Sequence, residues 1–511
     1  MAMDFLAQHA ARQPGRAAVV LQDGPTLTYA ELDSEANRLA NAMLDLGLQS
    51  LDKCTTVGYN SPHHLVVGSA SRRLVLVSLP MNYRLTPEEI EYQLRHSDTR
   101  ILFSGPEQVD KVEQVATRCP ELRHKVAWGR DDLPPGWRRF DDLVAAGSPA
   151  PPPVEAGLTG PSMTYTAGTT GNPKGAYRAS GVDPKAIQDQ FRWFDLRPGD
   201  VHLAAGPLYH SAPGSFAGLH LILGGTAVLM RRFDPETALR LIEEHRVNNT
   251  FMAPTLLKRI VSLPDEVRKR YDLSSMHSIV VAAAPCPFEV KRRVMDLFGP
   301  VLYEFYGASE TGVNTLMRPE EQLEKPGSCG RLAEGVEMKI LDDAGNECPR
   351  GIPGEIWVKA PSLITEYYNN PKATSEARRG EYFSVGDVAY FDDDGYLFVV
   401  DRKRDMIISG GVNICSTEVE NVIHAHPGVW DVAVIGIPDE EWGESVHAIV
   451  QPKPGESLEA DDVAEFVKLH LADYKKPRSI EIRADLPRDE AGKIRKRELR
   501  EPFWAGHTKR V

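Results

Sequence analysis

The sequence of 511 residues contains no long hydrophobic run, few cysteines and no excess of basic side chains. Its longest apolar stretch, around residues 219–230, is too short to span a bilayer, and the N-terminus lacks the pattern of a signal peptide. We therefore expect a cytoplasmic protein. The six cysteines include no CxxC pair, which argues against a zinc site or a disulfide framework. A formal net charge of -13 would repel phosphates, so we expect no nucleic acid partner.

The hydrophobic pattern alternates between helical and strand-like segments. Apolar residues recur at spacings of three and four over residues 32–46, and Gly47 follows as a C-terminal cap, which predicts an amphipathic helix. Strand-like runs at 278–284 and 354–359 alternate with helical stretches such as 233–245. This rhythm predicts an α/β fold of mostly parallel sheets covered by helices.

Two segments suggest how the chain is divided. Residues 131–158 are rich in Pro, Gly and Ala, which predicts an exposed connector between two sub-sheets rather than an element of either. A burst of charge near 401–405 predicts a boundary between a large domain, residues 1–403, and a small mobile domain, residues 404–511. The small domain has its own candidate elements, namely strands at 431–437 and 446–451 and a helix at 463–471.

The strongest local signal is the sequence YTAGTTGNPKG at residues 165–175. Glycines let backbone N–H groups approach phosphate oxygens, threonines add donors, and Lys174 adds positive charge. Pro173 stands where a Walker loop requires glycine, so the segment is not of that type. Composition alone is equally consistent with a flexible Thr/Gly turn on the surface.

The loop resembles the YTSGTTGxPKG signature of the adenylate-forming superfamily, which includes acyl-CoA synthetases, peptide-synthetase adenylation domains and firefly luciferase. The resemblance covers nearly the whole chain and favours the acyl-CoA ligase branch. The further matches, in the order of the family, are LTYAEL at 27–32, PMNYRL at 80–85, PLYH at 207–210, YGASET at 306–311, GD at 386–387, DRKRD at 401–405, GG at 410–411, LPR at 486–488 and GK at 492–493.

The resemblance implies roles for individual residues. Lys493, Glu310 and Thr166 would be catalytic: Lys493 would neutralise charge on the attacked phosphate, and Glu310 would hold Mg2+. The Tyr306 ring would stack on adenine, and Asp387 would bind the ribose. The full set expected to bind ATP or CoA is Thr166, Gly168, Thr169, Thr170, Gly171, Lys174, Tyr306, Gly307, Glu310, Thr311, Asp387, Arg402, Gly410, Gly411 and Lys493.

In the family the small domain rotates after adenylate formation, and the resemblance places its hinge at Arg404. The same resemblance implies an acid-binding pocket formed by Tyr209, His210, Ala282, Ala283, Ala284, Gly307 and Ala308. Four departures from the family pattern each remove a polar group or alter a contact: Ala167, Val385, Val412 and Cys415-Ser416. Alanines at 282 and 283 stand where the family has glycines, which predicts a tighter pocket.

The function implied is that of an ATP-dependent carboxylic acid:CoA ligase that uses ATP, Mg2+ and CoA. The acid would be a medium- or long-chain fatty acid or a bulky alicyclic or steroid-like acid, and an aryl acid is the alternative. No carrier domain follows Lys493, which argues against a complete synthetase module. A stand-alone adenylating enzyme that loads a carrier protein remains an open alternative. A luciferase is disfavoured by the Lys-Arg-Val ending. Retention of Lys493, Glu310 and Lys174 argues against a scaffold without catalysis. A homodimer is compatible with the sequence.

Overall fold

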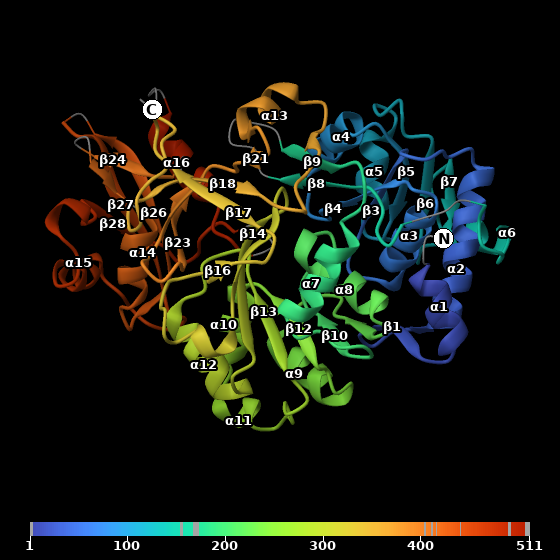
Figure 1. The fold of residues 1–511 in the computed structure, drawn as a ribbon, viewed down its shortest axis with the longest axis horizontal. Helices are drawn as coiled ribbons and strands as arrows, with labels where there is room; N and C mark the ends of the chain where they lie inside the picture. The colour runs from blue at the N-terminus through green and yellow to red at the C-terminus, as the bar shows by residue number, and fades with distance from the viewer. Residues whose placement is uncertain are drawn as a thin grey trace. The chain divides into compact units, whose positions relative to one another are not determined.

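A computed structural model describes residues 4–153, 157–166, 173–402, 405–409, 412–414, 416–439, 441–488 and 492–505, with the backbone alone at 401, 402, 412 and 413. The chain forms two compact units (Figure 1). The first unit comprises Met1–Glu324, Ala333–Val336 and Lys359–Glu381, and the second comprises Lys325–Leu332, Glu337–Val358 and Tyr382–Val511.

The first unit contains a mixed sheet with the order β19-β9-β8-β4-β3-β5-β6-β7. Its strands are β3 (Lys53–Val57), β4 (Val77–Met81), β5 (Thr99–Ser104), β6 (His124–Ala127), β7 (Trp137–Arg139), β8 (Ser162–Thr166), β9 (Lys174–Arg178) and β19 (Glu366–Tyr367). From β8 to β7 all neighbours are parallel, whereas β8 pairs antiparallel with β9. The segment between β8 and β9 carries the predicted phosphate loop.

A second sheet of the same unit has the order β15-β14-β13-β12-β10-β11-β1-β2. Its strands are β1 (Ala17–Leu21), β2 (Thr26–Thr28), β10 (Val201–Ala204), β11 (Thr226–Leu229), β12 (Asn249–Met252), β13 (Ser278–Val281), β14 (Leu302–Ala308) and β15 (Gly312–Met317). The strands from β1 to β14 are parallel, and β15 returns antiparallel. The predicted strand at 278–284 is thus confirmed but ends at Val281.

Helices cover both sheets. They are α1 (Phe5–Arg12), α2 (Tyr29–Asp45), α3 (Pro62–Arg73), α4 (Pro87–His96), α5 (Val109–Ala116), α6 (Phe140–Ala146), α7 (Pro184–Trp193), α8 (Ser211–Ile222), α9 (Pro235–Glu244), α10 (Pro254–Val261), α11 (Asp265–Arg268), α12 (Phe288–Phe298) and α13 (Pro371–Ala377). A single hydrophobic cluster contains residues of α2, α3 and α8 and of strands from both sheets, so these helices join the two sheets through one core. The α/β fold class is confirmed.

The predicted helix at 32–46 is α2. Its predicted apolar face is buried, and Gly47 after the C-cap has a φ of +83°, as a C-terminal glycine requires. The preceding motif explains where the helix begins. Thr28 accepts a hydrogen bond from the Glu31 N–H, while the Glu31 carboxylate accepts one from the Thr28 N–H, which forms a capping box. The LTYAEL match therefore encodes a helix start.

The prediction for residues 131–158 is wrong in part. Trp137–Arg139 form β7, which pairs parallel with β6 at the edge of the sheet, and helix α6 follows directly. Burial of Trp137, Phe140 and Leu143 stabilises both elements. The proline-rich part after α6 has no regular structure where it is described.

The second unit contains two further sheets. The first pairs β21 (Tyr382–Phe383), β18 (Gly354–Lys359), β22 (Asp387–Phe391) and β23 (Leu397–Arg402), and β17 (Glu337–Leu341) joins β18. The predicted strand at 354–359 is confirmed as β18. The remaining strands before residue 404 are the short β16 (Arg331–Leu332) and β20 (Arg378–Arg379).

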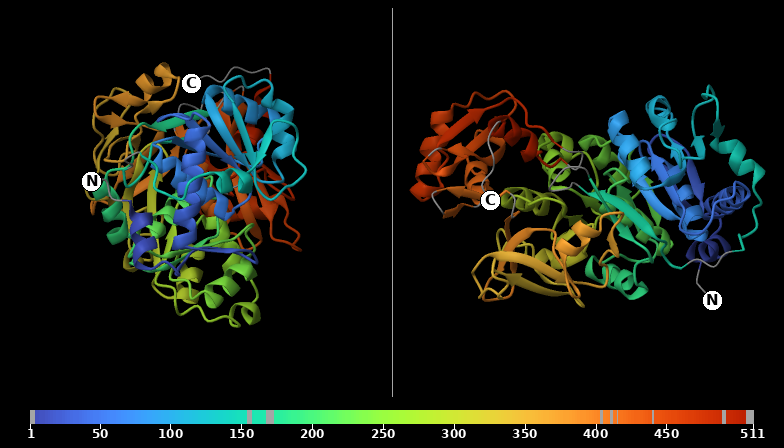
Figure 2. Two further views of the ribbon diagram at one scale, coloured as in Figure 1. Left: turned by 90° about the vertical axis from the view of Figure 1, so that its right-hand side faces the viewer. Right: turned by 90° about the horizontal axis from the view of Figure 1, so that it is seen from above.

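The other sheet of the second unit is built entirely from residues beyond 404, which are coloured orange to red in the right-hand view of Figure 2. It pairs β25 (Val412–Ile414), β24 (Ile407–Ser409), β27 (Gly443–Pro452), β26 (Val429–Asp439) and β28 (Ser479–Ile482), with helices α14 (Ser416–His424), α15 (Ala460–Lys468) and α16 (Lys496–Trp504). The predicted strands and helix of this region are confirmed, while the domain boundary at 403 stays a prediction. Within the described residues, we find no helix with both the length and the apolar character needed to cross a membrane.

Candidate active site

Several of the predicted site segments follow parallel strands of the second sheet of the first unit. Residues 207–210 come after β10, residues 282–284 after β13, and residues 309–311 after β14. The strands are parallel, so their carboxyl ends lie at one edge of the sheet. This edge is the usual position of ligand sites in α/β proteins.

The turn between β14 and β15 carries Glu310 and Thr311. The Thr311 N–H donates to the Ala308 carbonyl at 3.2 Å, and the Thr311 hydroxyl accepts a hydrogen bond from Asn314 at 2.8 Å. A Cβ atom at Gly307 would lie 2.1 Å from the Gly312 carbonyl oxygen, so only glycine fits there. Both predicted polar residues are therefore held in a rigid, buried turn.

Thr166 and Glu310 meet although they come from different sheets. The Thr166 hydroxyl, at the end of β8, donates a hydrogen bond to Glu310 Oε1 at 2.9 Å. The hydroxyl of Tyr367, on β19, donates to the same oxygen at 3.1 Å. The Glu310 side chain is nearly buried, so these two donors fix the direction in which its carboxylate points.

Two cations contact residues next to this carboxylate. The Lys174 ammonium lies 4.8 Å from the centre of the Tyr367 ring. Arg178 donates hydrogen bonds to the carbonyls of Ser309, at 3.1 Å, and Ser362, at 2.6 Å. Burial lowers the pKa of Arg178, and the charge of Glu310 opposes this shift. The site thus combines one oriented carboxylate with two positive groups, which suits a metal-bound polyphosphate.

The predicted acid-binding residues lie in the same unit. Tyr209 is buried and packs edge-on against Tyr83, with ring centres 5.5 Å apart. The hydroxyl of Ser211, the first residue of α8, lies 2.9 Å from that of Ser309, which links the start of this helix to the Glu310 turn. Ala283 has a φ of +77°, in the left-handed region, and its methyl group is exposed.

The second unit carries Asp387, Arg402 and Lys493. Asp387 on β22 stands opposite Arg402 on β23 in the antiparallel ladder, after a register shift between Val388 and Ala389. The backbone thus pairs the two residues expected to bind ribose. Lys493 is half-buried and follows Gly492, whose φ is +80°.

Some predicted residues lie outside the described part of the chain. They are Gly168, Thr169, Thr170, Gly171, Arg404, Gly410 and Gly411. Of Arg402 only the backbone is described. Sequence reasoning missed Tyr367 and Arg178, since neither lies in a motif that was singled out. Only the fold brings Tyr367 to Glu310, which is 57 residues away in the chain.

Comparisons with known proteins agree with this geometry. The AMP-binding enzyme family matches residues 6–368, and the AMP-binding enzyme C-terminal domain matches residues 418–493. A feruloyl-CoA synthase from an Amycolatopsis species is 35% identical over 96% of this chain and 97% of its own. Fatty acid–[acyl-carrier-protein] ligase ScoC from Streptomyces coeruleorubidus is 33% identical over 99% of this chain and 96% of its own. The ATP-bound structure of MatB from Rhodopseudomonas palustris has a TM-score of 0.87 and 28% identity, and the match covers 99% of this chain and 100% of that one.

A matched region that covers most of the chain, together with relatives similar over almost their full length, establishes the class of protein. The chain belongs to the AMP-binding enzyme family. Within it the chain is an enzyme of the acyl-CoA synthetase type, in the group of acyl- and aryl-CoA ligases. The resemblance inferred from the sequence motifs is confirmed.

Proposed function

We propose that the chain is an ATP-dependent carboxylic acid:CoA ligase that works in two steps. In the first, a carboxylate oxygen of the acid attacks the α-phosphorus of ATP, the bond to the β-phosphate oxygen breaks, and acyl-AMP and pyrophosphate form. In the second, the sulfur of CoA attacks the acyl carbon, the thiol proton is lost, and AMP leaves. Both steps need several anions to be held close together, which requires positive charge and oriented donors.

The observation that carries this proposal is the contact of Thr166 and Glu310 beside Lys174. A hydroxyl and a buried carboxylate meet next to the predicted phosphate loop, and an ammonium group lies over the ring of Tyr367, whose hydroxyl donates to the same carboxylate. Magnesium is held in such sites by one or two carboxylates together with the phosphates of the substrate. Glu310 fits this requirement, and Thr166 and Lys174 would contact phosphate oxygens. A bound ion would neutralise part of the phosphate charge.

Other predicted roles complete the proposal. Tyr306 on β14 would stack on adenine, with Gly307 and Ala308 leaving room for the nucleotide and the acid. Asp387 and Arg402, paired across β22 and β23, support a ribose site. Lys493 would supply charge in the first step only. Residues from 404 onward would then rotate about Arg404, and Gly410 and Gly411 would line the path of the pantetheine chain.

For the acid, we propose a medium- or long-chain fatty acid or a bulky alicyclic acid. Buried Tyr209 and the apolar cluster around Ala282, Phe216 and Phe251 support an apolar pocket. An aryl acid is a second candidate, because a relative similar over almost the full length is a feruloyl-CoA synthase. The ScoC relative, whose name states a carrier-protein acceptor, supports an acyl carrier protein as the alternative to CoA.

A panel of acids tests both the reaction and its specificity. Purified protein is incubated with Mg-ATP and fatty, alicyclic or aryl acids, with CoA or a pantetheinylated carrier protein as acceptor, and AMP and thioester are measured. We expect acid-dependent AMP and acyl-CoA from the wild type and neither from Glu310→Ala. Activity with aryl acids alone would replace the proposed substrate class. Absence of acyl-adenylate with every acid, despite binding of Mg-ATP, would refute the ligase.

A further inference from the structure

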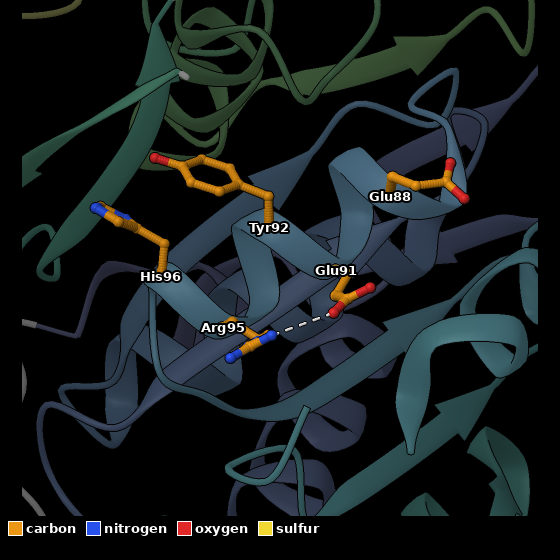
Figure 3. A pocket seen from close by; sticks show the side chains of 5 residues that line it. All are labelled: Glu88, Glu91, Tyr92, Arg95 and His96. Carbon is orange, nitrogen blue, oxygen red and sulfur yellow. Dashed lines mark hydrogen bonds and ion pairs between the residues drawn. The ribbon is translucent and has the colours of Figure 1, made fainter. Parts of the chain in front are cut away.

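Helix α4 lies beside the strands that flank the predicted phosphate loop, yet none of the predicted roles involves it. A surface hollow of about 470 Å³ is lined by five residues of this helix, whose side chains are drawn in Figure 3: Glu88, Glu91, Tyr92, Arg95 and His96. Tyr92 and His96 project to one side, while Arg95 and Glu91 form an ion pair with each other at 3.3 Å. The helix thus presents two aromatic side chains toward its neighbours and separate charges toward solvent.

One contact of α4 holds the strand that enters the loop. The Tyr165 hydroxyl lies 2.8 Å from His96 Nδ1 and 3.3 Å from the Gln93 carbonyl. Both contacts are hydrogen bonds at once when Nδ1 carries the hydrogen, since the imidazole then donates to the tyrosine oxygen and the hydroxyl donates to the carbonyl. Tyr165 directly precedes Thr166, which donates to Glu310.

A second contact holds the strand that leaves the loop. The Tyr92 hydroxyl donates to the Pro173 carbonyl at 3.0 Å. Proline has no N–H and its φ is fixed, so an anchored carbonyl at this position sets the direction in which the chain enters β9. The next residue is Lys174, the first of β9, whose ammonium lies over Tyr367.

The residues of α4 that make these two contacts also contact each other, and the end of α4 contacts the segment after β19. The rings of Tyr92 and His96 stack with centres 5.4 Å apart. The segment after β19 is also tied to the end of α4, because Tyr368 donates to Asp98 at 3.0 Å and Asn369 donates to the His96 carbonyl at 3.4 Å. Helix α4 and its C-terminal end therefore contact Tyr165, Pro173 and the Tyr368–Asn369 segment, which directly adjoin Thr166, Lys174 and Tyr367 in the chain.

We propose that α4 is a positioning element of the nucleotide site, in which Tyr92 and Tyr165 hold Lys174 and Thr166 at the spacing that ATP phosphates require. Neither tyrosine hydroxyl needs to touch the nucleotide. The proposal rests on the proposed function for the identity of the ligand. It concerns only the described flanks of the loop and assigns no contact to residues 167–172.

The test is the affinity for Mg-ATP of variants that lack a single hydroxyl, measured by calorimetry without acid or CoA. Tyr92→Phe retains the ring and loses only the bond to Pro173, and we expect about three- to tenfold weaker binding, the effect of one lost hydrogen bond. Tyr165→Phe should behave similarly. In steady state the KM for ATP should rise by the same factor, while kcat and the KM for the acid stay within about twofold, since the hydrogen bonds of the two hydroxyls involve Pro173, His96 and Gln93 and none of the predicted acid-binding residues.

Arg95→Ala is the matched control, because it removes a side chain of the same hollow whose ion pair, with Glu91, lies within α4. It should leave the affinity for Mg-ATP unchanged. Wild-type affinity in both tyrosine variants, or an equal loss in Arg95→Ala, would overturn the positioning role. A rise in both KM values would show a general effect on folding instead, and would overturn it too. A wild type that binds Mg-ATP without forming acyl-adenylate refutes the proposed ligase but leaves this test intact.

Discussion

Replacing Ala283 with glycine should stabilise the protein and widen the acid pocket at the same time. Ala283 has a φ of +77°, and a left-handed backbone costs about 1–2 kcal/mol for a residue with a Cβ atom. Its methyl group is exposed, so its removal loses little packing. Glycine also lowers the free energy of unfolding by about 0.5–1 kcal/mol, because the unfolded chain has more conformational freedom at a glycine. The net gain should be about 0.5–1 kcal/mol.

Scanning calorimetry and kinetics measure the two effects separately. A gain of this size should raise the Tm by about 0.5–1 °C in a protein of this length. In the acid series, the ratio of kcat/KM for bulky acids to that for small acids should rise up to about tenfold, as expected when one methyl group is removed from a pocket. Ala282→Gly is the control, because Ala282 is buried, outside the left-handed region, and should lose about 1 kcal/mol.

Each half of this prediction can fail by itself. A lower Tm for Ala283→Gly would show that the local backbone is not strained. An unchanged ratio of kcat/KM across the acids, together with a higher Tm, would show that the strain is real and that Ala283 does not border the acid.

Further predictions concern the roles of single residues. Lys493→Ala should lower adenylation by at least about 10²- to 10³-fold, yet leave conversion of supplied acyl-adenylate to acyl-CoA nearly intact, as single-turnover assays with each substrate would reveal. Gly411→Leu should spare pyrophosphate exchange and block thioester formation; equal loss of both would contradict a role in the pantetheine path. Tyr367→Phe should weaken Mg-ATP binding severalfold through the freed Glu310 carboxylate, with little change in the KM for the acid. Burial lowers the pKa of His220 to about 4, so the neutral ring stabilises the fold fully above the unfolded pKa near 6.5 and progressively less as pH falls toward 4. Between pH 7 and 5 this loss is about 2 kcal/mol, and His220→Asn should reduce the pH dependence of the unfolding free energy by that amount.

The sequence allowed prediction of features that depend on local periodicity or on a motif. Helix α2 follows from apolar residues at three- and four-residue spacing, and β18 from a run of β-branched residues. Strand β7 did not follow, because three residues are too few for a period and its stability comes from the burial of Trp137 against the sheet. The motif at 27–32 forms a capping box between Thr28 and Glu31 at the start of α2.

In the candidate site, too, residues that lie in motifs were predicted, whereas a residue placed by tertiary structure was not. Thr166 and Glu310 were predicted from their motifs, and their contact agrees with the roles assigned to them. Tyr367 could not be predicted, because tertiary structure brings it to Glu310: β19 pairs with β9 at the edge of the sheet, and the Ile364 N–H donates to the Glu310 carbonyl at 2.8 Å. A tyrosine in a two-residue strand offers no periodicity or spacing that would single it out.

The irregular pairing of β22 with β23 determines which residue stands opposite Asp387 in the ladder. Ala389 pairs with Val399, but Val388 pairs with Asp401 and Asp387 with Arg402, so Val400 is an extra residue in one strand. If Val400 were part of the ladder and paired with Val388, regular pairing would place Asp387 opposite Asp401. The bulge of one residue therefore sets Arg402 as the backbone partner of Asp387. In evolution, deletion of Val400 would remove the bulge and still leave Asp387 opposite Arg402, so the register depends on the exclusion of this residue from the ladder and not on its side chain.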